Sequence, residues 1–420
     1  MRKSSRISTI VIIAVLFIWG GFVFCNSAVA ADKEPIKWGS LDCMSGTFGA
    51  FGKGNIGGTK LAIKEINESG GILGRPIVHM IEDTEANTEV AARKARKLIL
   101  KDKVDVLQGA ASTSTTALIM KTAGKYKTLH INSEFDSKSI LPAKNDYSFT
   151  MAPICEETER ARILGIKKIF PPAERKRWFI FYPDYSFGRD MRDVYINELK
   201  KIIPDAEIVG TLAHPFNETD YSTHIAKILA AKPDIVIPCA WAGDFLNFVK
   251  QAKPLGFFQK TKYIASTACM SAIVGLGEEL PKDLWVVTEQ GNPYLPELAS
   301  WKNKYYEYLG EWPITEAATT YYDTVYMYKA AVEKAGSTDA TKVAKALEGL
   351  KYKGIGGTRY VKPNHIIEVD NIVFAQFNYD KDLKQPVVSR MERIPFHDVM
   401  YSNDDLIKSG CDWCKGISMQ

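Results

Sequence analysis

Residues 104–117, with the sequence VDVLQGAASTSTTA, decide the fold that we expect for this chain. The stretch opens with a short apolar, partly β-branched run that ends at Gly109, a pattern typical of a buried parallel strand. Five hydroxyl-bearing residues, 112–116, come next, and the apolar run from Ala117 predicts a helix. A strand, a small-residue turn, hydroxyl groups and a helix N-terminus together predict an anion-binding site at the carboxyl end of a strand. The alternative is that the hydroxyl groups only cap the helix.

The first thirty residues have the pattern of a secretory signal peptide. A basic segment at 2–6 precedes an almost wholly apolar run at 7–24, and the small residues Ala28-Val29-Ala30 fit a cleavage site. A retained membrane anchor is the alternative, because the apolar run is nearly long enough to span a bilayer. We therefore predict a cleaved signal peptide over residues 1–30 and an exported protein.

The remaining length and charge limit what the protein can be. About 390 residues follow the predicted signal peptide, which is too many for one hydrophobic core and favours two lobes. The whole chain carries a formal charge of +5, and three of these charges belong to the basic segment, which leaves about +2. The basic run within 93–103 alternates with apolar residues and is typical of a solvated helix face, so a nucleic-acid surface is not expected.

Six of the seven cysteines follow the predicted signal peptide. Cys411 and Cys414 form a C-x-x-C motif near the C-terminus, without the second pair or the nearby histidines that a zinc site needs. A redox motif would open a helix after a strand rather than lie in a tail. A small local disulfide is therefore expected in an oxidising compartment. The sequence does not show how the other four cysteines pair, which are Cys43, Cys155, Cys239 and Cys269.

Strands and helices are predicted to alternate in two successive series, which is typical of α/β lobes with parallel sheets. The first series has strands at 36–41, 77–81, 104–107 and 129–132, helices at 58–68, 88–101 and 115–126, and a Gly- and Phe-rich loop at 42–57. The second series has strands at 178–182, 207–211, 234–239, 263–266 and 284–288, and helices at 189–202, 222–231 and 243–252.

The last part of the chain does not begin a third lobe. Its pattern predicts helices at 296–309, 315–334 and 338–350, a Gly-rich crossing at 354–358 and an extended segment at 366–377. A chain that returns to both lobes crosses between them more than once. This predicts a hinged pair with a ligand-binding cleft.

Several segments resemble the leucine/isoleucine/valine-binding proteins of bacterial ABC importers. The most specific are residues 67–74 (NESGGILG) and the hydroxyl cluster; residues 36–40, 184–188, 220–222 and 321–323 are also similar. The resemblance implies a type I periplasmic binding fold, in which two Rossmann-like α/β lobes are joined by three hinge crossovers. It implies an N-terminal lobe of residues 31–152 plus 290–356, a C-terminal lobe of 153–289 plus 357–400, and a tail of 401–420.

The resemblance also implies which residues bind the ligand. In that family the serine that opens the hydroxyl cluster and its neighbours hold the ligand carboxylate, and the loop after the fourth strand and three loops of the second lobe complete the site. Here that loop has acids where the family has alanine and threonine, and Thr267 takes the place of the acid that binds the amino group. The implied set is Ser112, Thr113, Ser114, Thr115, Glu134, Phe135, Asp136, Tyr185, Phe187, Trp241 and Thr267.

These departures leave three interpretations of Glu134 and Asp136. The ligand amine is held from the first lobe, or the ligand is not an α-amino acid, or both carboxylates point to water. Two unpaired carboxylates at a dry site would be costly, so at least one should meet a cation, a hydroxyl group or solvent. The aromatic residues of the predicted set suit an aromatic or cationic head group.

We predict that the protein is not an enzyme and uses no cofactor or metal. The G-x-G-x-x-G at residues 52–57 lies about ten residues after the first strand, which disfavours a dinucleotide site. No histidine lies in a recognised catalytic motif, so a secreted hydrolase is a weak alternative. We expect a monomeric periplasmic binding protein that delivers an amino acid or a related small carboxylate or amine to an inner-membrane ABC permease. The stronger alternative is an exported ligand sensor of the same fold that docks a receptor.

Overall fold

The structure is a computed structural model that describes residues 34–110 and 112–417. The predicted signal peptide, Ala111 and residues 418–420 lie outside the described residues. The described residues belong to one compact unit. In the part of the chain that is described, no helix is both long enough and apolar enough to cross a membrane.

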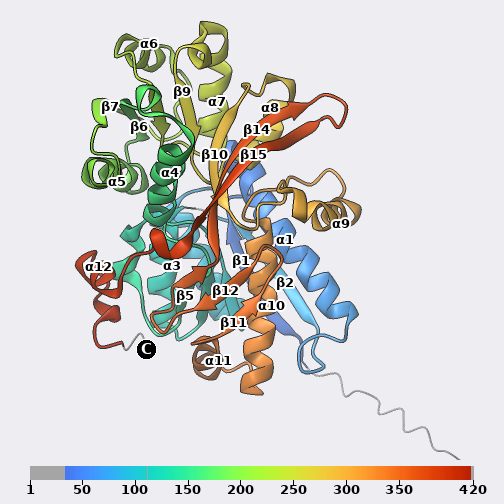
Figure 1. Ribbon diagram of the computed structural model, residues 1–420. Helices are drawn as coiled ribbons and strands as arrows, with labels where there is room; N and C mark the ends of the chain where they lie inside the picture. Colours follow the sequence, from blue (N-terminus) through green and yellow to red (C-terminus); the bar gives the residue numbers. More distant parts are fainter. Residues whose placement is uncertain (1–33, 111, 418–420) are drawn as a thin grey trace, which may run out of the picture. The chain divides into compact units, whose positions relative to one another are not determined.

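The first half of the fold is a five-stranded parallel sheet in the order β2-β1-β3-β4-β5. Figure 1 labels β1, β2 and β5 of this sheet. Its strands are β1 (Ile36–Asp42), β2 (Ile77–Asp83), β3 (Val106–Gln108), β4 (Leu129–Asn132) and β5 (Ser148–Thr150). The helices between them are α1 (Gly49–Glu68), α2 (Thr88–Arg96) and α3 (Thr113–Lys125). A π-helical turn, Lys97–Asp102, extends α2.

The second half is a seven-stranded sheet in the order β15-β14-β10-β9-β8-β6-β7. Its parallel strands are β6 (Arg177–Pro183), β7 (Glu207–His214), β8 (Ile235–Pro238), β9 (Lys262–Ala265) and β10 (Leu284–Glu289). Its remaining strands are β14 (Asn371–Asp380), antiparallel to β10, and β15 (Gln385–Pro395), antiparallel to β14. The accompanying helices are α4 (Cys155–Ile169), α5 (Ser186–Ile202), α6 (Ser222–Ala230), α7 (Ala242–Ala252) and α8 (Met270–Leu276).

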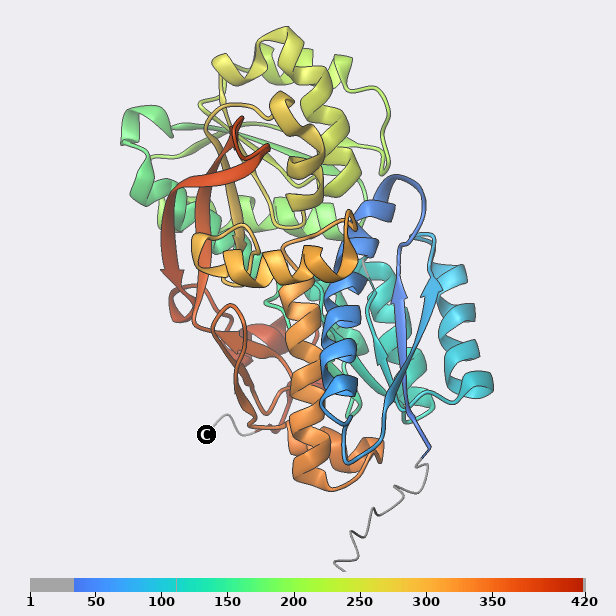
Figure 2. The same ribbon diagram turned by 90° about the vertical axis from the view of Figure 1, so that its right-hand side faces the viewer.

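After β10 the chain returns to the first sheet. It forms α9 (Ala299–Leu309), α10 (Ala318–Ala335), α11 (Ala340–Leu347) and a small antiparallel sheet of β11 (Lys351–Lys353), β12 (Thr358–Val361) and β13 (Ile367–Val369). Helix α10, drawn in orange, packs along the blue α1 (Figure 2). The chain thus passes between the large sheets after β5, after β10 and before β14, which confirms the predicted fold class with its three crossovers. The exact lobe boundaries stay a prediction.

A buried arginine connects these crossings. The guanidinium of Arg359, in β12, donates hydrogen bonds to the Met151 carbonyl oxygen (3.3 Å) and to the Thr320 hydroxyl group (2.7 Å). It also forms ion pairs with Glu289 (3.3 Å) and Asp323 (3.1 Å). Met151 follows β5, Glu289 ends β10 and Asp323 lies in α10. Arg359 therefore joins the first two crossings to α10 and to the segment that leads to the third.

The prediction of a loop over residues 42–57 was wrong. Most of the Gly-rich segment 42–57 is helical, because α1 already begins at Gly49. Glycine disfavours helices, but here its lack of a side chain is needed for packing. A Cβ atom at Gly54 would lie 2.6 Å from Thr315 Cγ2, and one at Gly58 would lie 1.8 Å from the Ala318 carbonyl oxygen. Tertiary packing against the start of α10 thus overrides the local preference.

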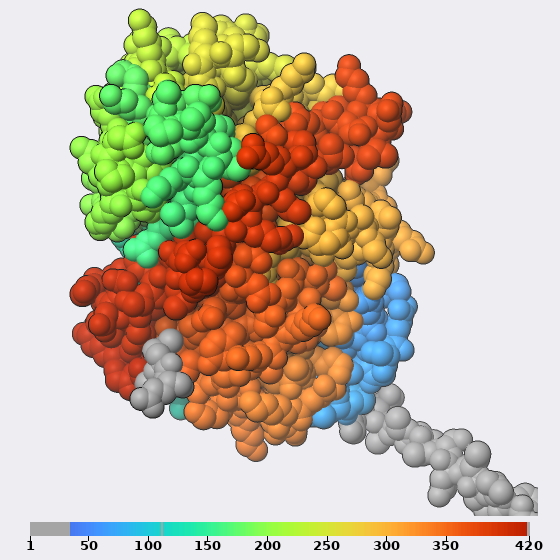
Figure 3. Space-filling model, viewed as in Figure 1, coloured from blue at the N-terminus to red at the C-terminus, as the bar shows by residue number. Residues whose placement is uncertain are grey.

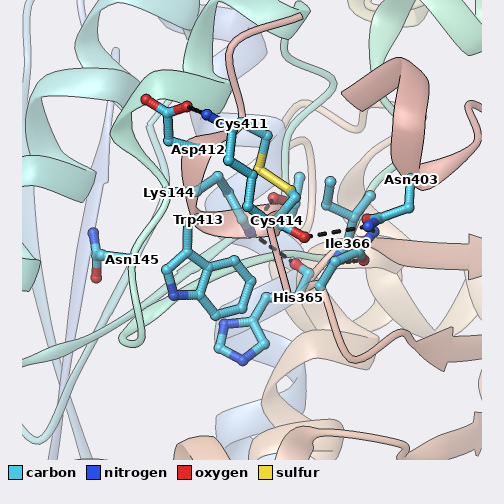
Figure 4. The surroundings of a disulfide bond; sticks show 12 residues. Lys144, Asn145, His365, Ile366, Asn403, Cys411, Asp412, Trp413 and Cys414 are labelled. Carbon is cyan, nitrogen blue, oxygen red and sulfur yellow. Dashed lines mark hydrogen bonds and ion pairs between the residues drawn. A yellow bond between two sulfur atoms is a disulfide. The ribbon is translucent and has the colours of Figure 1, made fainter. Parts of the chain in front are cut away.

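The C-terminal tail packs against the first half of the fold. The predicted disulfide between Cys411 and Cys414 is confirmed, and the other cysteines of the described chain are buried and free. The Trp413 ring packs against that of His365 with a centroid separation of 4.2 Å (Figure 4). Its Nε1 donates a hydrogen bond to Asp146 at 2.8 Å. The red C-terminal segment runs across one face of the molecule, between the green and orange parts of the chain (Figure 3).

Candidate functional site

Loops from the carboxyl ends of both large sheets line one small buried cavity. Its lining residues are Phe51, Ser112, Thr113, Glu134, Phe135, Tyr185, Phe187, Trp241, Thr267 and Ala268. The first five follow β1, β3 and β4, and the others follow β6, β8 and β9. Carboxyl-end loops are where open α/β sheets bind ligands. The free volume is about 20 Å³, room for about one or two water molecules.

Eight of the eleven predicted site residues line this cavity, and three do not. Ser114 is exposed. Thr115 is buried and serves the helix end, because its hydroxyl group donates to the Ser112 carbonyl oxygen (2.7 Å) and accepts from the Ser112 N–H (3.3 Å). Asp136 is buried beside the cavity without lining it. The capping interpretation therefore holds for Thr115, whereas Ser112 and Thr113 face the cavity.

The N-terminus of α3 forms one end of the cavity. Ser112 caps this helix, and its hydroxyl group lies 2.8 Å from that of Thr115. The Thr113 hydroxyl group accepts a hydrogen bond from the Ser137 N–H (3.3 Å). Because a helix N-terminus carries partial positive charge and unpaired N–H groups, this end is suited to an anionic group.

A buried carboxylate pair lies close by. The side chain of Glu134 is 3% exposed. The Asn55 amide donates to both Glu134 and Asp42, the latter at 3.3 Å, and the Tyr321 hydroxyl group donates to Asp42 at 2.8 Å. Burial raises the pKa of Asp42 to about 6. Burial, followed by the charge of Asp42, raises the pKa of Glu134 well above its usual range.

Asp136 has a different environment. It is 1% exposed and accepts a hydrogen bond from the Asn132 amide at 2.8 Å. Burial raises its pKa to about 7, against hydrogen bonds from the hydroxyl groups of Thr116 and Thr113. The interpretation in which Glu134 and Asp136 point to water is wrong, because the loop after β4 folds inward and buries both carboxyl groups.

Aromatic rings from both halves of the fold close the cavity. Trp241 Nε1 donates a hydrogen bond to the Tyr185 hydroxyl oxygen at 3.0 Å. The Trp241 ring stacks on Phe48 with a centroid separation of 4.4 Å and meets the edge of Phe51 at 5.3 Å. Phe48 and Phe51 belong to the segment that opens α1, whereas Trp241 precedes α7. The two halves thus meet through apolar rings.

Two further contacts hold the halves together around the cavity. The Ser137 hydroxyl group donates to Asp190, at a distance of 2.6 Å, and so links the loop after β4 to α5. A Cβ atom at Gly243 would lie 2.2 Å from Thr47 Cγ2, so the start of α7 presses directly on the segment before α1. A ligand as large as an amino acid therefore requires these contacts to separate or the lining side chains to move.

Sequence reasoning missed four residues of this site. Phe51 and Ala268 line the cavity, while Asn55 and Tyr321 bond to the carboxylate pair. Phe51 carries a usable signal, because Phe48 and Phe51 share one face of a helical segment once the helix is known to start near them. Asn55 and Tyr321 lie far from Glu134 in the sequence, and only the fold brings them to it.

The comparisons with known proteins agree with this arrangement. A family described as periplasmic binding protein matches residues 35–382. Leu/Ile/Val-binding protein homolog 4 of Brucella abortus is 25% identical over 248 residues, which cover 57% of this chain and 58% of that relative. The chain thus matches little more than half the length of this curated relative.

Solved structures share the fold over most of their length. A branched-chain amino acid transporter substrate-binding protein from Streptococcus pneumoniae, in complex with isoleucine, matches with a TM-score of 0.73 and 18% identity and covers 86% of this chain and 99% of its own. A solute-binding protein from R. palustris, in complex with benzoate, matches with a TM-score of 0.75 and 18% identity over 86% of this chain and 97% of its own. The chain belongs to the periplasmic binding protein family and has the type I periplasmic binding fold.

Proposed function

We propose that this protein binds an amino acid or a related small carboxylate or amine in the cavity between its two halves and delivers it to an ABC permease. The observation that carries the proposal is that loops from both sheets line the same cavity. A ligand that contacts both halves stabilises the closed arrangement relative to an open one, because it gains its full contacts only when the halves meet.

The proposed cycle assigns a task to each side of the cavity. Ser112 and Thr113, at the N-terminus of α3, receive the ligand in the open form. Phe187 and Trp241 then cover it from the second half and exclude water. The closed form docks a permease in the inner membrane. A monomer in the periplasm, released from its predicted signal peptide, fits this cycle.

A thermal-shift screen tests the proposal directly. Ligand that binds only the folded protein raises the melting temperature, by a free energy of about 2.7 kcal/mol at one hundred times the Kd. The library should contain amino acids, aromatic acids, amides and polyamines. We expect at least one class to raise the melting temperature of the wild type and to lose that effect in Trp241→Ala. A library in which no compound stabilises the wild type would overturn the proposal.

A further inference from the structure

We propose that the ligand carries a cationic group and that Glu134, with Asp42 behind it and aromatic rings around it, forms the subsite for that cation. When the cation enters, the Glu134–Asp42 pair releases a proton to solvent. This inference rests on the proposed function, because it assumes that the cavity is the ligand site.

Acidic and neutral groups surround the carboxyl group of Glu134. The groups that face its carboxyl group are Asp42 from β1, Asp136 from the same loop, Glu316 just before α10, Tyr321 in α10 and the Asn55 amide from α1. The thiols of Cys43 and Cys155 also lie close enough to interact with its charge. None of these groups is a cation. Among the described residues, no lysine, arginine or histidine forms an ion pair with Glu134 or Asp42. The protein itself therefore does not compensate two ionised carboxylates here.

This arrangement affects the protonation of Glu134 and Asp42. Two buried carboxylates that share one amide donor repel each other when both are charged, so one of them retains its proton. The raised pKa values of Asp42 and Glu134 agree with this state. A ligand ammonium group placed against Glu134 reverses the balance, because an opposite charge within a few ångströms favours the ionised carboxylate. Cation binding and proton release are then coupled.

Aromatic rings line the cavity beside Glu134. Phe51, Phe135 and Trp241 line it together with Glu134, and ring faces attract cations most strongly when water is excluded. Thr267 is 4% exposed and also lines the cavity. Because a hydroxyl group can both donate and accept hydrogen bonds, Thr267 offers a further polar group to a ligand.

The groups around the cavity distinguish ligands that carry an amino group from ligands that do not. The N-terminus of α3 suits a carboxylate, whereas Glu134 and the rings suit an ammonium group. An amino acid or an amine meets the second requirement. An aromatic acid without an amino group does not, because it would leave the carboxylate pair unneutralised.

The test compares matched compounds by isothermal titration calorimetry. The probes are L-leucine and L-phenylalanine, their deaminated acids 4-methylpentanoate and 3-phenylpropanoate, and the corresponding amines 3-methylbutylamine and 2-phenylethylamine. We expect the amine-bearing probes to bind at least tenfold more tightly than the deaminated acids. In Glu134→Gln this preference should be lost. Glu156→Gln is the matched control, because Glu156 is also a buried carboxylate with a raised pKa but does not line the cavity.

Proton release provides a readout that a merely structural role of Glu134 would not change. Titrations at pH 7 in two buffers with different ionisation enthalpies should show up to one proton released per amine bound to the wild type and none in Glu134→Gln. The affinity for amines should rise with pH until the pair is ionised, while that for the deaminated acids should not.

The outcomes distinguish the two proposals. If deaminated acids bind as tightly as amino acids and Glu134→Gln changes neither affinity nor proton release, the cation subsite is refuted and the solute-binding function stands. If neither these probes nor the wider library bind at all, the proposed function itself is refuted, and the inference falls with it.

Discussion

Replacing Arg359 by methionine should destabilise the protein strongly, and the loss should depend on pH. The substitution removes the cation that faces Glu289 and Asp323, both of which are buried. Removing one partner of a buried ion pair typically costs about 3–5 kcal/mol. The same range follows from protonating one carboxyl group whose ordinary pKa is near 4.3 at pH 7.5, at about 1.4 kcal/mol per pH unit.

The direction of the pH effect follows from the two acids. Burial already raises the pKa values of Glu289 and Asp323, and Arg359 opposes that shift. Without the guanidinium their pKa values rise further in the folded state. A raised carboxyl pKa leaves stability intact below the unfolded value and removes it progressively as pH rises from the unfolded to the folded value. The deficit of Arg359→Met relative to wild type should therefore be about 2–3 kcal/mol smaller at pH 5 than at pH 7.5.

Guanidinium unfolding at pH 5 and pH 7.5 measures both quantities. Arg393→Met is the matched control, because Arg393 pairs with Glu297 at the surface, where the two side chains are 39% and 43% exposed. Such a pair is worth about 1 kcal/mol at most. Adding Glu289→Gln and Asp323→Asn to Arg359→Met should restore part of the lost stability. A deficit below about 1 kcal/mol at pH 7.5, or one that is equal at both pH values, would refute the reasoning.

Three further predictions address the site and the packing. Ser112→Ala should weaken ligand binding by about 1–3 kcal/mol in calorimetry, whereas Ser114→Ala, two residues away and exposed, should leave it unchanged; equal losses would remove Ser112 from the site. Glu134→Gln should be no less stable than wild type at pH 5 and relatively more stable as pH rises, because the wild type must ionise a carboxyl group whose pKa is raised; a falling relative melting temperature would contradict this. Gly58→Ala should lower the free energy of unfolding by about 1–3 kcal/mol or more, because its Cβ atom would lie 1.8 Å from the Ala318 carbonyl oxygen. Gly275→Ala, whose Cβ atom meets nothing within 4 Å, should stabilise the protein by about 0.4–1 kcal/mol. Similar melting temperatures for the two variants would argue against tight packing of α1.

The sequence predicted the elements whose pattern is local. Strand β4 has the predicted bounds Leu129–Asn132, because apolar and polar residues alternate in this short run, as is typical of a strand. Helix α4 was not predicted. Its sequence, CEETERARILGIKKI, has charges on every face, yet Glu156, Glu157, Glu159 and Arg162 are all buried. Glu159 pairs with Arg162 at the i,i+3 spacing. Glu156 and Glu157 instead accept hydrogen bonds from the backbone N–H groups of Lys138 and Tyr401, and only the fold brings these donors to them.

The same distinction applies to the site. The hydroxyl cluster could be found because it follows a strand directly, and loops at the carboxyl ends of parallel strands converge. The aromatic residues of the set were implied by the family resemblance. The environment of Glu134 could not be found, because its partners Asn55 and Tyr321 come from α1 and α10. Local sequence also does not tell which hydroxyl groups face a cavity and which, like that of Thr115, close the helix end.

The packing of α1 on α10 has a consequence for the order in which the protein assembles. Helix α1 comes from the beginning of the described chain, and the helix that covers it begins at Ala318. Contacts between such distant segments form late, because a long loop must close first. A chain that has emerged only as far as β10 can pair all five strands of its first sheet but leaves the glycine face of α1 bare. The first half is thus completed only after strands β6 to β10 of the second have been synthesised, and the second sheet in turn waits for β14 and β15. Neither the start nor the middle of this polypeptide therefore reaches its final packing ahead of the rest.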